Sequence, residues 1–308
     1  MQNKAARLGG FVLPEKRLFM KRFVSRDLIN KGWSGDLKYC VVDESGCRYL
    51  LRVSSADRKE RVEKTYNRMQ KVAELTIPVC RSIEWGECDE GVYILQTWID
   101  GDDAEKVIPA LPEDRQYSYG LDAGRSLRAI HSILPTEGEH NWEEYFNRKI
   151  DRKLAGYVEC PLKHPGGELM IDYIQANRGL LAGRPVTYQH GDFHIGNMMV
   201  DTAGNLVIID FEKDDYGDPW EEFNRIVWCA QAAPTFARGI VDGYFNGQIP
   251  DKFWKLLALY IATNTLSSLP WAIPFGQEEI DVMLRQGRDV LSWYDGMKNV
   301  IPTWYRGK

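Results

Sequence analysis

The sequence predicts an α+β protein of two lobes: a small N-terminal lobe with an antiparallel β-sheet and one helix, and a larger, mainly α-helical C-terminal lobe. Strand-like runs joined by turn residues fill much of the first hundred residues. One long helical pattern interrupts them, and apolar residues at helical spacing dominate the rest of the chain. A chain of 308 residues is long enough to bury the core of both lobes.

Three parts are expected along the chain: an N-terminal extension over residues 1–22, an N-terminal lobe over 23–99 and a C-terminal lobe over 100–308. The residues before Phe23 carry no pattern that assigns them to a strand or helix. Met1 and Met20 are therefore both candidate starts of translation. The sequence does not indicate an oligomeric state.

The N-terminal lobe is expected to contain four strands and one helix. In the helix every third residue from Tyr66 to Leu75 is apolar, which makes a stripe that can be buried. The turn residues Asp43-Glu-Ser-Gly46 separate the first two strands. The predicted elements are strands at 38–42, 48–53, 78–85 and 91–97 and a helix at 57–75.

The C-terminal lobe is expected to be built from helices. Apolar residues at helical spacing predict helices at 117–134, through much of 141–181 and at 253–265. Two prolines within 268–275 predict an ordered loop there. Asp218 followed by Pro219 has the composition of a helix start. His131, inside the first of these helices, is interpreted as a structural residue.

One stretch of the C-terminal lobe concentrates polar groups that can bind a metal ion or accept a proton. Asp192 and Asn197 lie five residues apart, and Asp210 follows an apolar run that predicts a buried strand. The segment 201–205 has the composition of a hairpin turn, so a hairpin would bring Asn197 and Asp210 together. A carboxylate and an amide carbonyl suit Mg²⁺ that also binds phosphate oxygens. Asp192 would be left free to face a substrate hydroxyl.

These residues resemble a known family. His190-Gly-Asp-Phe-His-Ile-Gly-Asn197 with Ile209-Asp-Phe-Glu212 is similar to the H-G-D-x-x-x-x-N and I-D-x-E signatures of the aminoglycoside phosphotransferase family, small-molecule relatives of protein kinases. The resemblance covers roughly residues 27–291 and implies a protein-kinase-like fold with nucleotide between the lobes. The family has a G-D-P segment that matches residues 217–219, which implies a structural role for Asp218. On the alternative interpretation, His190 and Asp192 only close a loop by hydrogen bonding to the backbone.

The resemblance also implies where the nucleotide, ATP or alternatively GTP, is bound. Gly32, Ser34 and Gly35 lie in a strand-turn-strand position, where backbone amides can approach phosphate oxygens. The segment after the last strand of the N-terminal lobe is similar to the family's linker between lobes. The backbone of Thr97 and Ile99 would therefore hydrogen-bond the purine.

At the strand position where the family has a phosphate-binding lysine, this sequence has Arg52. A guanidinium binds phosphate and stays charged, but its fork imposes a different geometry. The family's pairing glutamate would fall near Thr65, so the sequence departs from the pattern twice. Glu60 and Glu63 are the available substitutes, and the sequence does not choose between them.

Phosphoryl transfer to a hydroxyl of a small molecule follows from the resemblance, with Asp192 as the catalytic residue and Asn197 and Asp210 as Mg²⁺ ligands. Residues 1–100 contain 18 Lys and Arg against 14 Asp and Glu, a net charge of +4; residues 101–308 contain 21 against 30, a net charge of −9. A basic N-terminal third suits a polyphosphate, an acidic remainder suits a cationic acceptor such as an aminoglycoside-like antibiotic, and nucleic acid fits poorly. The alternative is a nucleotide-binding pseudokinase with a regulatory role, which the two departures at Arg52 and Thr65 favour.

We expect the protein to be cytoplasmic. The six cysteines form no C-x-x-C pair, so they are interpreted as reduced thiols. No apolar run approaches the roughly 20 residues that cross a membrane, and the first residues lack the apolar segment of a secretion signal.

Overall fold

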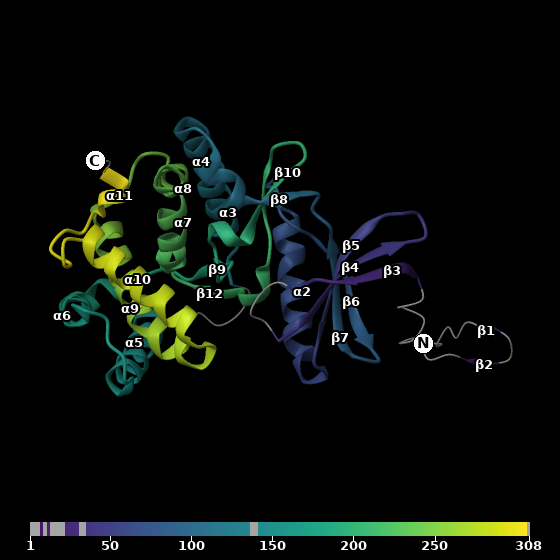
Figure 1. The fold of residues 1–308 in the computed structure, drawn as a ribbon, viewed down its shortest axis with the longest axis horizontal. Helices are drawn as coiled ribbons and strands as arrows, with labels where there is room; N and C mark the ends of the chain where they lie inside the picture. The colour runs from purple at the N-terminus through teal and green to yellow at the C-terminus, as the bar shows by residue number, and fades with distance from the viewer. Residues whose placement is uncertain (1–6, 9–10, 13–21, 31–34, 136–140, 307–308) are drawn as a thin grey trace. The chain divides into compact units, whose positions relative to one another are not determined.

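The computed structural model describes residues 7–8, 11–12, 22–30, 35–135 and 141–306 (Figure 1). The chain divides into two compact units, Met1–Gly101 and Asp102–Lys308. The first contains a sheet with one long helix and the second is mainly helical, which confirms the predicted fold class.

The N-terminal unit is a five-stranded antiparallel sheet with the strand order β3-β4-β5-β7-β6. Helix α2 packs against β6 and β7 through its buried residues Val62, Met69 and Val72. The elements are β1 (Arg7–Leu8), β2 (Phe11–Val12), β3 (Phe23–Leu28), β4 (Leu37–Asp43), β5 (Arg48–Ser54), η1 (Ala56–Arg58), α2 (Lys59–Ala73), β6 (Ser82–Cys88) and β7 (Gly91–Thr97).

The predicted strands and helix of this unit are present, with two differences. β6 begins at Ser82, four residues later than predicted. β3 is not predicted, because an edge strand with half of its residues exposed lacks a continuous apolar pattern. The turn between β4 and β5 forms as expected: the Asp43 side chain accepts hydrogen bonds from the amides of Ser45 and Cys47.

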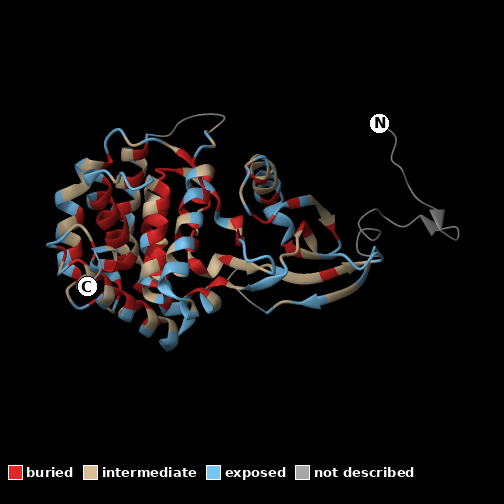
Figure 2. Ribbon diagram, turned by 90° about the horizontal axis from the view of Figure 1, so that it is seen from above, coloured by how far each residue is buried: buried red, intermediate tan, exposed pale blue. Residues whose placement is uncertain are grey.

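The C-terminal unit has α9 in its core, with 14 of the 22 residues of this helix buried. Figure 2 shows the buried residues of the helical unit in red. α9 contacts α5, α6 and α10. The α-helices are α3 (Ala104–Val107), α4 (Glu113–Ile130), α5 (Trp142–Glu159), α6 (Gly167–Asn177), α7 (Ile226–Ala232), α8 (Pro234–Phe245), α9 (Asp251–Ala272), α10 (Gln277–Trp293) and α11 (Thr303–Arg306). The short 3₁₀ helices are η2 (Ile108–Ala110), η3 (Arg178–Leu181), η4 (Ile195–Asn197), η5 (Phe211–Lys213), η6 (Glu221–Arg225) and η7 (Ile273–Phe275).

Short strands connect these helices and carry the polar stretch singled out in the sequence. The hairpin of β10 and β11 extends to β8 in one sheet, and β9 pairs with β12 in another. Their bounds are β8 (Gly101–Asp103), β9 (Thr187–Gln189), β10 (Met198–Asp201), β11 (Leu206–Ile208) and β12 (Asp215–Gly217).

The loop predicted at residues 268–275 is wrong for its first part. α9 continues to Ala272 with Pro270 in its last turn, and η7 follows. Pro270 removes one backbone hydrogen bond of the helix, whereas unwinding would expose the fully buried Leu269 and Ala272. By length and composition the segment Asp251–Phe275 could cross a membrane, since an 18-residue window within it has a mean hydropathy of 1.3. However, 67% of this 18-residue window is buried inside the protein, as in a core helix.

Helices α4 and α8 approach each other so closely that only glycine fits between them. A Cβ atom on Gly124 of α4 would overlap the carbonyl oxygen of Ile240, and one on Gly243 of α8 would overlap that of Leu121. Gly120 and Gly239 face each other in the same way. The absence of side chains therefore allows backbone contact along this helix pair.

Replacing Gly124 by alanine should destabilise the protein, because the added methyl group forces two packed backbones apart at a cost of about 1–3 kcal/mol. Gly156→Ala in α5 is the matched control, since nothing lies within 4 Å of the added Cβ. It should instead stabilise by about 0.5–1 kcal/mol through helix propensity. Urea unfolding followed by circular dichroism measures both, and equal effects of the two changes would contradict the close helix contact.

Candidate active site

The loop between β9 and β10 is anchored by His190, which is fully buried. The Asp192 amide donates to Nδ1 of His190, at 3.2 Å, so the ring proton must lie on Nε2. Nε2 donates to the carbonyl of Ile209, at 2.9 Å. Both ring nitrogens of His190 therefore bond to the backbone, so the interpretation that this residue closes a loop is correct.

Gly191 allows the loop to pass close to the chain that follows β11. Its φ is 83°, and a Cβ atom there would overlap the carbonyl oxygen of Lys213. The Gly191 amide donates to Glu222, at 2.9 Å. Glu222 also lies 3.6 Å from His131, whose Nδ1 is 3.0 Å from the Tyr244 hydroxyl. His131 is therefore structural, as predicted, and supports the loop through Glu222.

The predicted hairpin is present. Met198 pairs with Ile208 and Val200 with Leu206. One step beyond this ladder, the Ile209 amide donates to the carbonyl of Asn197, at 3.0 Å. Asn197 and Asp210 therefore flank the same end of the hairpin, and Asp210 has a left-handed backbone with φ 65°.

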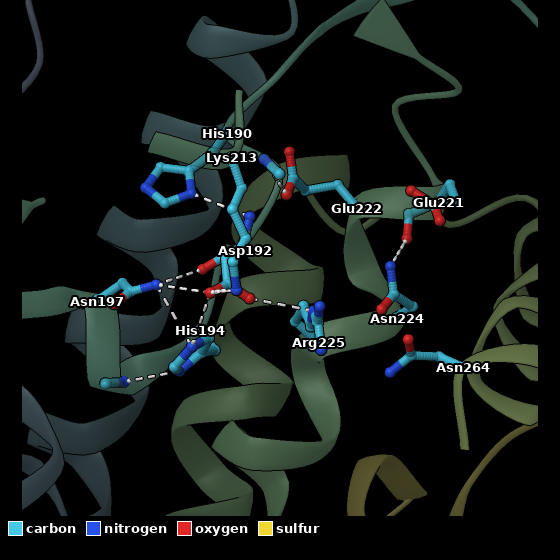
Figure 3. A network of polar contacts seen from close by, with 12 residues as sticks. His190, Asp192, His194, Asn197, Lys213, Glu221, Glu222, Asn224, Arg225 and Asn264 are labelled. Atoms are coloured by element: carbon cyan, nitrogen blue, oxygen red, sulfur yellow. Dashed lines mark hydrogen bonds and ion pairs between the residues drawn. The ribbon is translucent and has the colours of Figure 1, made fainter. Parts of the chain in front are cut away.

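Asp192 is not free, contrary to expectation. Its Oδ2 lies 2.9 Å from the Lys213 ammonium and 3.7 Å from Nε2 of His194 (Figure 3). Its Oδ1 lies 3.1 Å from Nε of Arg225. The side-chain amide of Asn197 donates to the backbone carbonyl of Asp192 at 2.9 Å and to its carboxylate Oδ2 at 3.3 Å. The sequence motif could not reveal Lys213 and Arg225, because chain folding alone brings them to Asp192.

These neighbours control the charge of Asp192. Burial by itself would raise the pKa of this carboxyl. The hydrogen bond from His194 and the charges of Arg225 and Lys213 outweigh burial and hold the pKa well below its usual range. Asp192 is therefore ionised at any ordinary pH, and it is a better hydrogen-bond acceptor than proton acceptor.

The residues at the hairpin end fit a magnesium ion. The amide nitrogen of Asn197 is used by Asp192, so its Oδ1 points to the other side of the amide. This oxygen and the Asp210 carboxylate are hard ligands of the kind that Mg²⁺ accepts. Among the described residues no group of three or more His, Cys, Asp or Glu could hold a metal ion. Mg²⁺ often binds through one or two side chains and substrate phosphates, and it needs no such group.

Of the three residues expected to approach phosphate, Gly32 and Ser34 lie outside the described residues. Gly35 is exposed, and nothing lies within 4 Å of the place that a Cβ atom would take there. A side chain would therefore fit at Gly35 without a clash.

Arg52 is buried in the N-terminal unit, and its Nε lies 3.8 Å from Oδ2 of Asp36. Asp36 also accepts a hydrogen bond from Arg58, at 3.1 Å. Glu60 and Glu63 are both exposed on α2. The acidic group beside Arg52 thus comes from the residue just before β4, and a family pattern based on a helix glutamate could not have indicated it.

At the end of β7 the structure corrects one expectation. The Thr97 amide donates to the carbonyl of Arg81, at 2.9 Å, and its hydroxyl accepts from the Arg81 amide. This N–H is therefore not available to a purine. Ile99 follows β7 and is partly buried.

Asp218 is fully buried and supports the site from behind, as its predicted structural role requires. Arg184 donates to both carboxylate oxygens at 2.7 Å, and the Tyr260 hydroxyl donates at 2.6 Å. The Trp220 amide donates at 2.9 Å, as to a helix cap. The segment that follows is the 3₁₀ helix η6 rather than an α-helix, which begins only at Ile226.

A second polar cluster adjoins Asp192 through Arg225. Lys149 and Lys153, one turn apart on α5 and here called the α5 lysine pair, face Glu221 of η6 and Asn264 of α9. The Lys149 ammonium lies 3.0 Å from Glu221, and that of Lys153 lies 3.5 Å from Oδ1 of Asn264. Burial, reinforced by the charge of Lys149, lowers the pKa of Lys153 to about 7.

The fold is that of the kinase-like phosphotransferases. The chain belongs to the phosphotransferase enzyme family (APH), whose model matches residues 27–254. No curated protein matches the chain.

Solved structures with the same fold are distant in sequence. A thermostable mutant of aminoglycoside phosphotransferase APH(4)-Ia, in apo form, is 17% identical with a TM-score of 0.65 over 90% of this chain and 98% of that one. A variant of it in ternary complex with ADP and hygromycin B is 16% identical, with a TM-score of 0.64 over 90% and 97%. The GDP complex of aminoglycoside 2'-phosphotransferase-IIIa is 12% identical, with a TM-score of 0.64 over 90% and 98%.

The depressed pKa of Lys153 predicts a pH dependence of stability. Between pH 7 and the ordinary lysine pKa near 10, the unfolded chain holds a proton that the folded protein has lost. The free energy of unfolding should therefore rise with pH in this window, by up to about 1.4 kcal/mol per unit relative to Lys153→Met. Urea unfolding at pH 7, 8 and 9 tests this, with the exposed Lys252→Met as control. If the free energy of unfolding changed with pH in the same way in wild type and Lys153→Met, burial would not lower the pKa of Lys153.

Proposed function

We propose that this protein transfers the γ-phosphoryl group of ATP, or alternatively GTP, to a hydroxyl of a small molecule. The observation that carries this proposal is an ionised carboxylate, Asp192, hydrogen-bonded to Asn197 at the end of a hairpin that also presents Asp210. The names of similar structures support it: one contains ADP and hygromycin B, and another contains GDP.

Asp192 would accept a hydrogen bond from the acceptor hydroxyl and orient its oxygen toward the γ-phosphorus. The new oxygen–phosphorus bond forms as the bond to the nucleoside diphosphate breaks, and the hydroxyl proton passes to Asp192. Because Lys213 and Arg225 make this carboxylate a weak base, the proton moves late, when the hydroxyl has become acidic. Positioning would therefore contribute more than proton abstraction.

Asn197 and Asp210 would hold Mg²⁺, which when bound neutralises phosphate charge. In the N-terminal unit Arg52 would contact a nucleotide phosphate. Its guanidinium beside Asp36 stays charged and can bind two oxygens at once. Ile99 remains the proposed backbone contact for the purine.

Two observations bear on the charge of the acceptor, and they point in opposite directions. The net charge of −9 over residues 101–308 favours an amine-bearing acceptor, such as an aminoglycoside-like antibiotic or a related metabolite. The side chains nearest Asp192 are instead cationic: Lys213, Arg225 and, beyond it, the α5 lysine pair.

Asp192→Asn should lower turnover by at least ~10²-fold and leave nucleotide affinity unchanged, because the variant keeps the shape but loses the charged acceptor. ADP release would be measured with Mg²⁺, ATP or GTP, and a panel of aminoglycosides, macrolides, choline and amino sugars. Nucleotide titration and thermal unfolding would verify that the variant is folded. Turnover close to wild type would sink the assignment of Asp192.

The alternative is a pseudokinase, favoured by Arg52 in place of lysine. Arg52→Lys distinguishes the two. In an active enzyme adapted to arginine, turnover should stay within the same order of magnitude or fall, because the shorter ammonium loses the fork geometry. Arg58→Lys is the control, since Arg58 also contacts Asp36 but is exposed. A large rise in turnover on Arg52→Lys alone would mean that the natural site is tuned down.

A further inference from the structure

The α5 lysine pair lies in a local excess of positive charge within an otherwise acidic unit. Lys149, Lys153 and Arg225 gather around Glu221, and Arg225 leads directly to Asp192. Figure 3 shows Arg225 beside Asp192, with Glu221 and Asn264 on the far side of Arg225 from the Asp192 loop. Arg225 therefore links Asp192, at 3.1 Å, to the charged groups around Glu221.

Most of these charges are already neutralised inside the protein. Arg225 is paired with Asp192, and Lys149 with Glu221 at 3.0 Å. Glu221 further accepts from Gln189, at 3.4 Å. The carboxylates of Asp192 and Glu221 are therefore paired with Arg225 and Lys149.

Lys153 differs from the other cations. Among the described residues no carboxylate lies within 4.0 Å of its ammonium, and its polar contact is the amide oxygen of Asn264, at 3.5 Å. An ammonium that is taken from water without a counter-charge destabilises the folded protein. An anion bound beside it would remove this cost.

A ligand can reach the cluster from solvent. The side chains of Lys149, Glu221 and Arg225 are 24%, 13% and 29% exposed. The cluster is thus a partly open, preformed arrangement of α5, η6 and α9 rather than a sealed core network.

We propose that Lys149 and Lys153 form a subsite for an anionic group, a carboxylate or a phosphate, carried by the acceptor whose hydroxyl faces Asp192. The role of Asp192 in this statement rests on the proposed function, whereas the anion subsite does not. The net charge of the unit is a weaker guide, because charges more than roughly 10 Å apart are largely screened by salt. The local unpaired cation therefore decides in favour of an anionic acceptor.

Anion binding can be tested without nucleotide and without turnover. Phosphate and acetate are the smallest probes, and each would be titrated at constant ionic strength while thermal unfolding is followed. At least one should stabilise the wild type, and which one does so distinguishes the phosphate from the carboxylate. Its affinity should fall at least tenfold in Lys153→Met, which removes the charge but keeps a similar shape, and stay unchanged in Lys252→Met. No stabilisation of the wild type by either probe, or equal affinity in Lys153→Met, would overturn the subsite.

The affinity for acetate measured over a range of pH distinguishes an anion-binding lysine from a merely structural one. Acetate stays ionised from pH 6 to 9, so its affinity should fall over this range as Lys153 loses its proton. The groups facing Lys153 are Lys149 and Arg152 of α5, Glu221 and Arg225 of η6, and Asn264 of α9.

Of these groups, two have shifted pKa values that keep them charged. Burial opposes both shifts, but the Lys149–Glu221 pair raises the pKa of Lys149 and lowers that of Glu221. Lys153→Arg should therefore bind acetate with no pH dependence in this range. A wild-type affinity that is constant with pH would contradict the role of Lys153.

Turnover separates failure of the subsite from failure of the proposed function. ADP release would be compared for glucuronate, glucose 6-phosphate, glucosamine and glucose, which share a sugar ring and differ in charge. Higher kcat/KM for an anionic sugar, reduced at least tenfold by Lys153→Met, supports the subsite. Turnover of glucosamine alone, unaffected by Lys153→Met, overturns the subsite and leaves the kinase intact. Lys153-dependent anion binding without ADP release from any acceptor supports the subsite and counts against the proposed function.

Discussion

The hydrogen bond from His190 to the carbonyl of Ile209 is the constraint on which the candidate site depends. It ties the loop that carries Asp192 to the strand end that carries Asp210. Because the same ring accepts the Asp192 amide, its tautomer is determined as well. This position needs a side chain with one nitrogen that donates a hydrogen bond and another that accepts one, and neutral histidine offers both.

Buried layers behind this loop make it rigid. Gly191 lies against the chain at Lys213, where no side chain fits, and its amide is held by Glu222. Asp218 links Arg184, Tyr260 of α9 and the start of η6. Buried charges are tolerated when they are fully hydrogen-bonded, and in return they define a single geometry. The polar groups of the site therefore rest on the helical core rather than on the loop alone.

Electrostatics around Asp192 favour orientation over proton abstraction. Two cations and an amide hold the carboxylate ionised, which lowers its basicity but fixes its oxygens. Phosphoryl transfer asks for little base strength, because the hydroxyl becomes acidic only as the new bond forms. The same cations extend, through Arg225, toward the α5 lysine pair. The side chains that pair with Asp192 thus differ in sign of charge from the unit as a whole.

Fold and substrate are separable in this family. Solved structures at 12–17% identity share the fold over 90% of the chain. Such similarity describes the scaffold alone. The acceptor depends on side chains that no motif specifies, and Lys153 is the one that we propose.

The sequence by itself determined the fold class, the strands β4, β5 and β7, the helices α2 and α5, and the hairpin that joins Asn197 to Asp210. These features depend on local periodicity and turn residues, which can be read without knowing any distant neighbour. Tertiary structure alone decided that Asp192 is paired with Lys213 and Arg225 and that Arg52 lies beside Asp36. It also decided that α9 continues through Pro270, because the burial of Leu269 and Ala272 outweighs a local breaker. Ion pairs and burial join residues far apart in the chain, and the spacing of residues along the sequence carries no record of them.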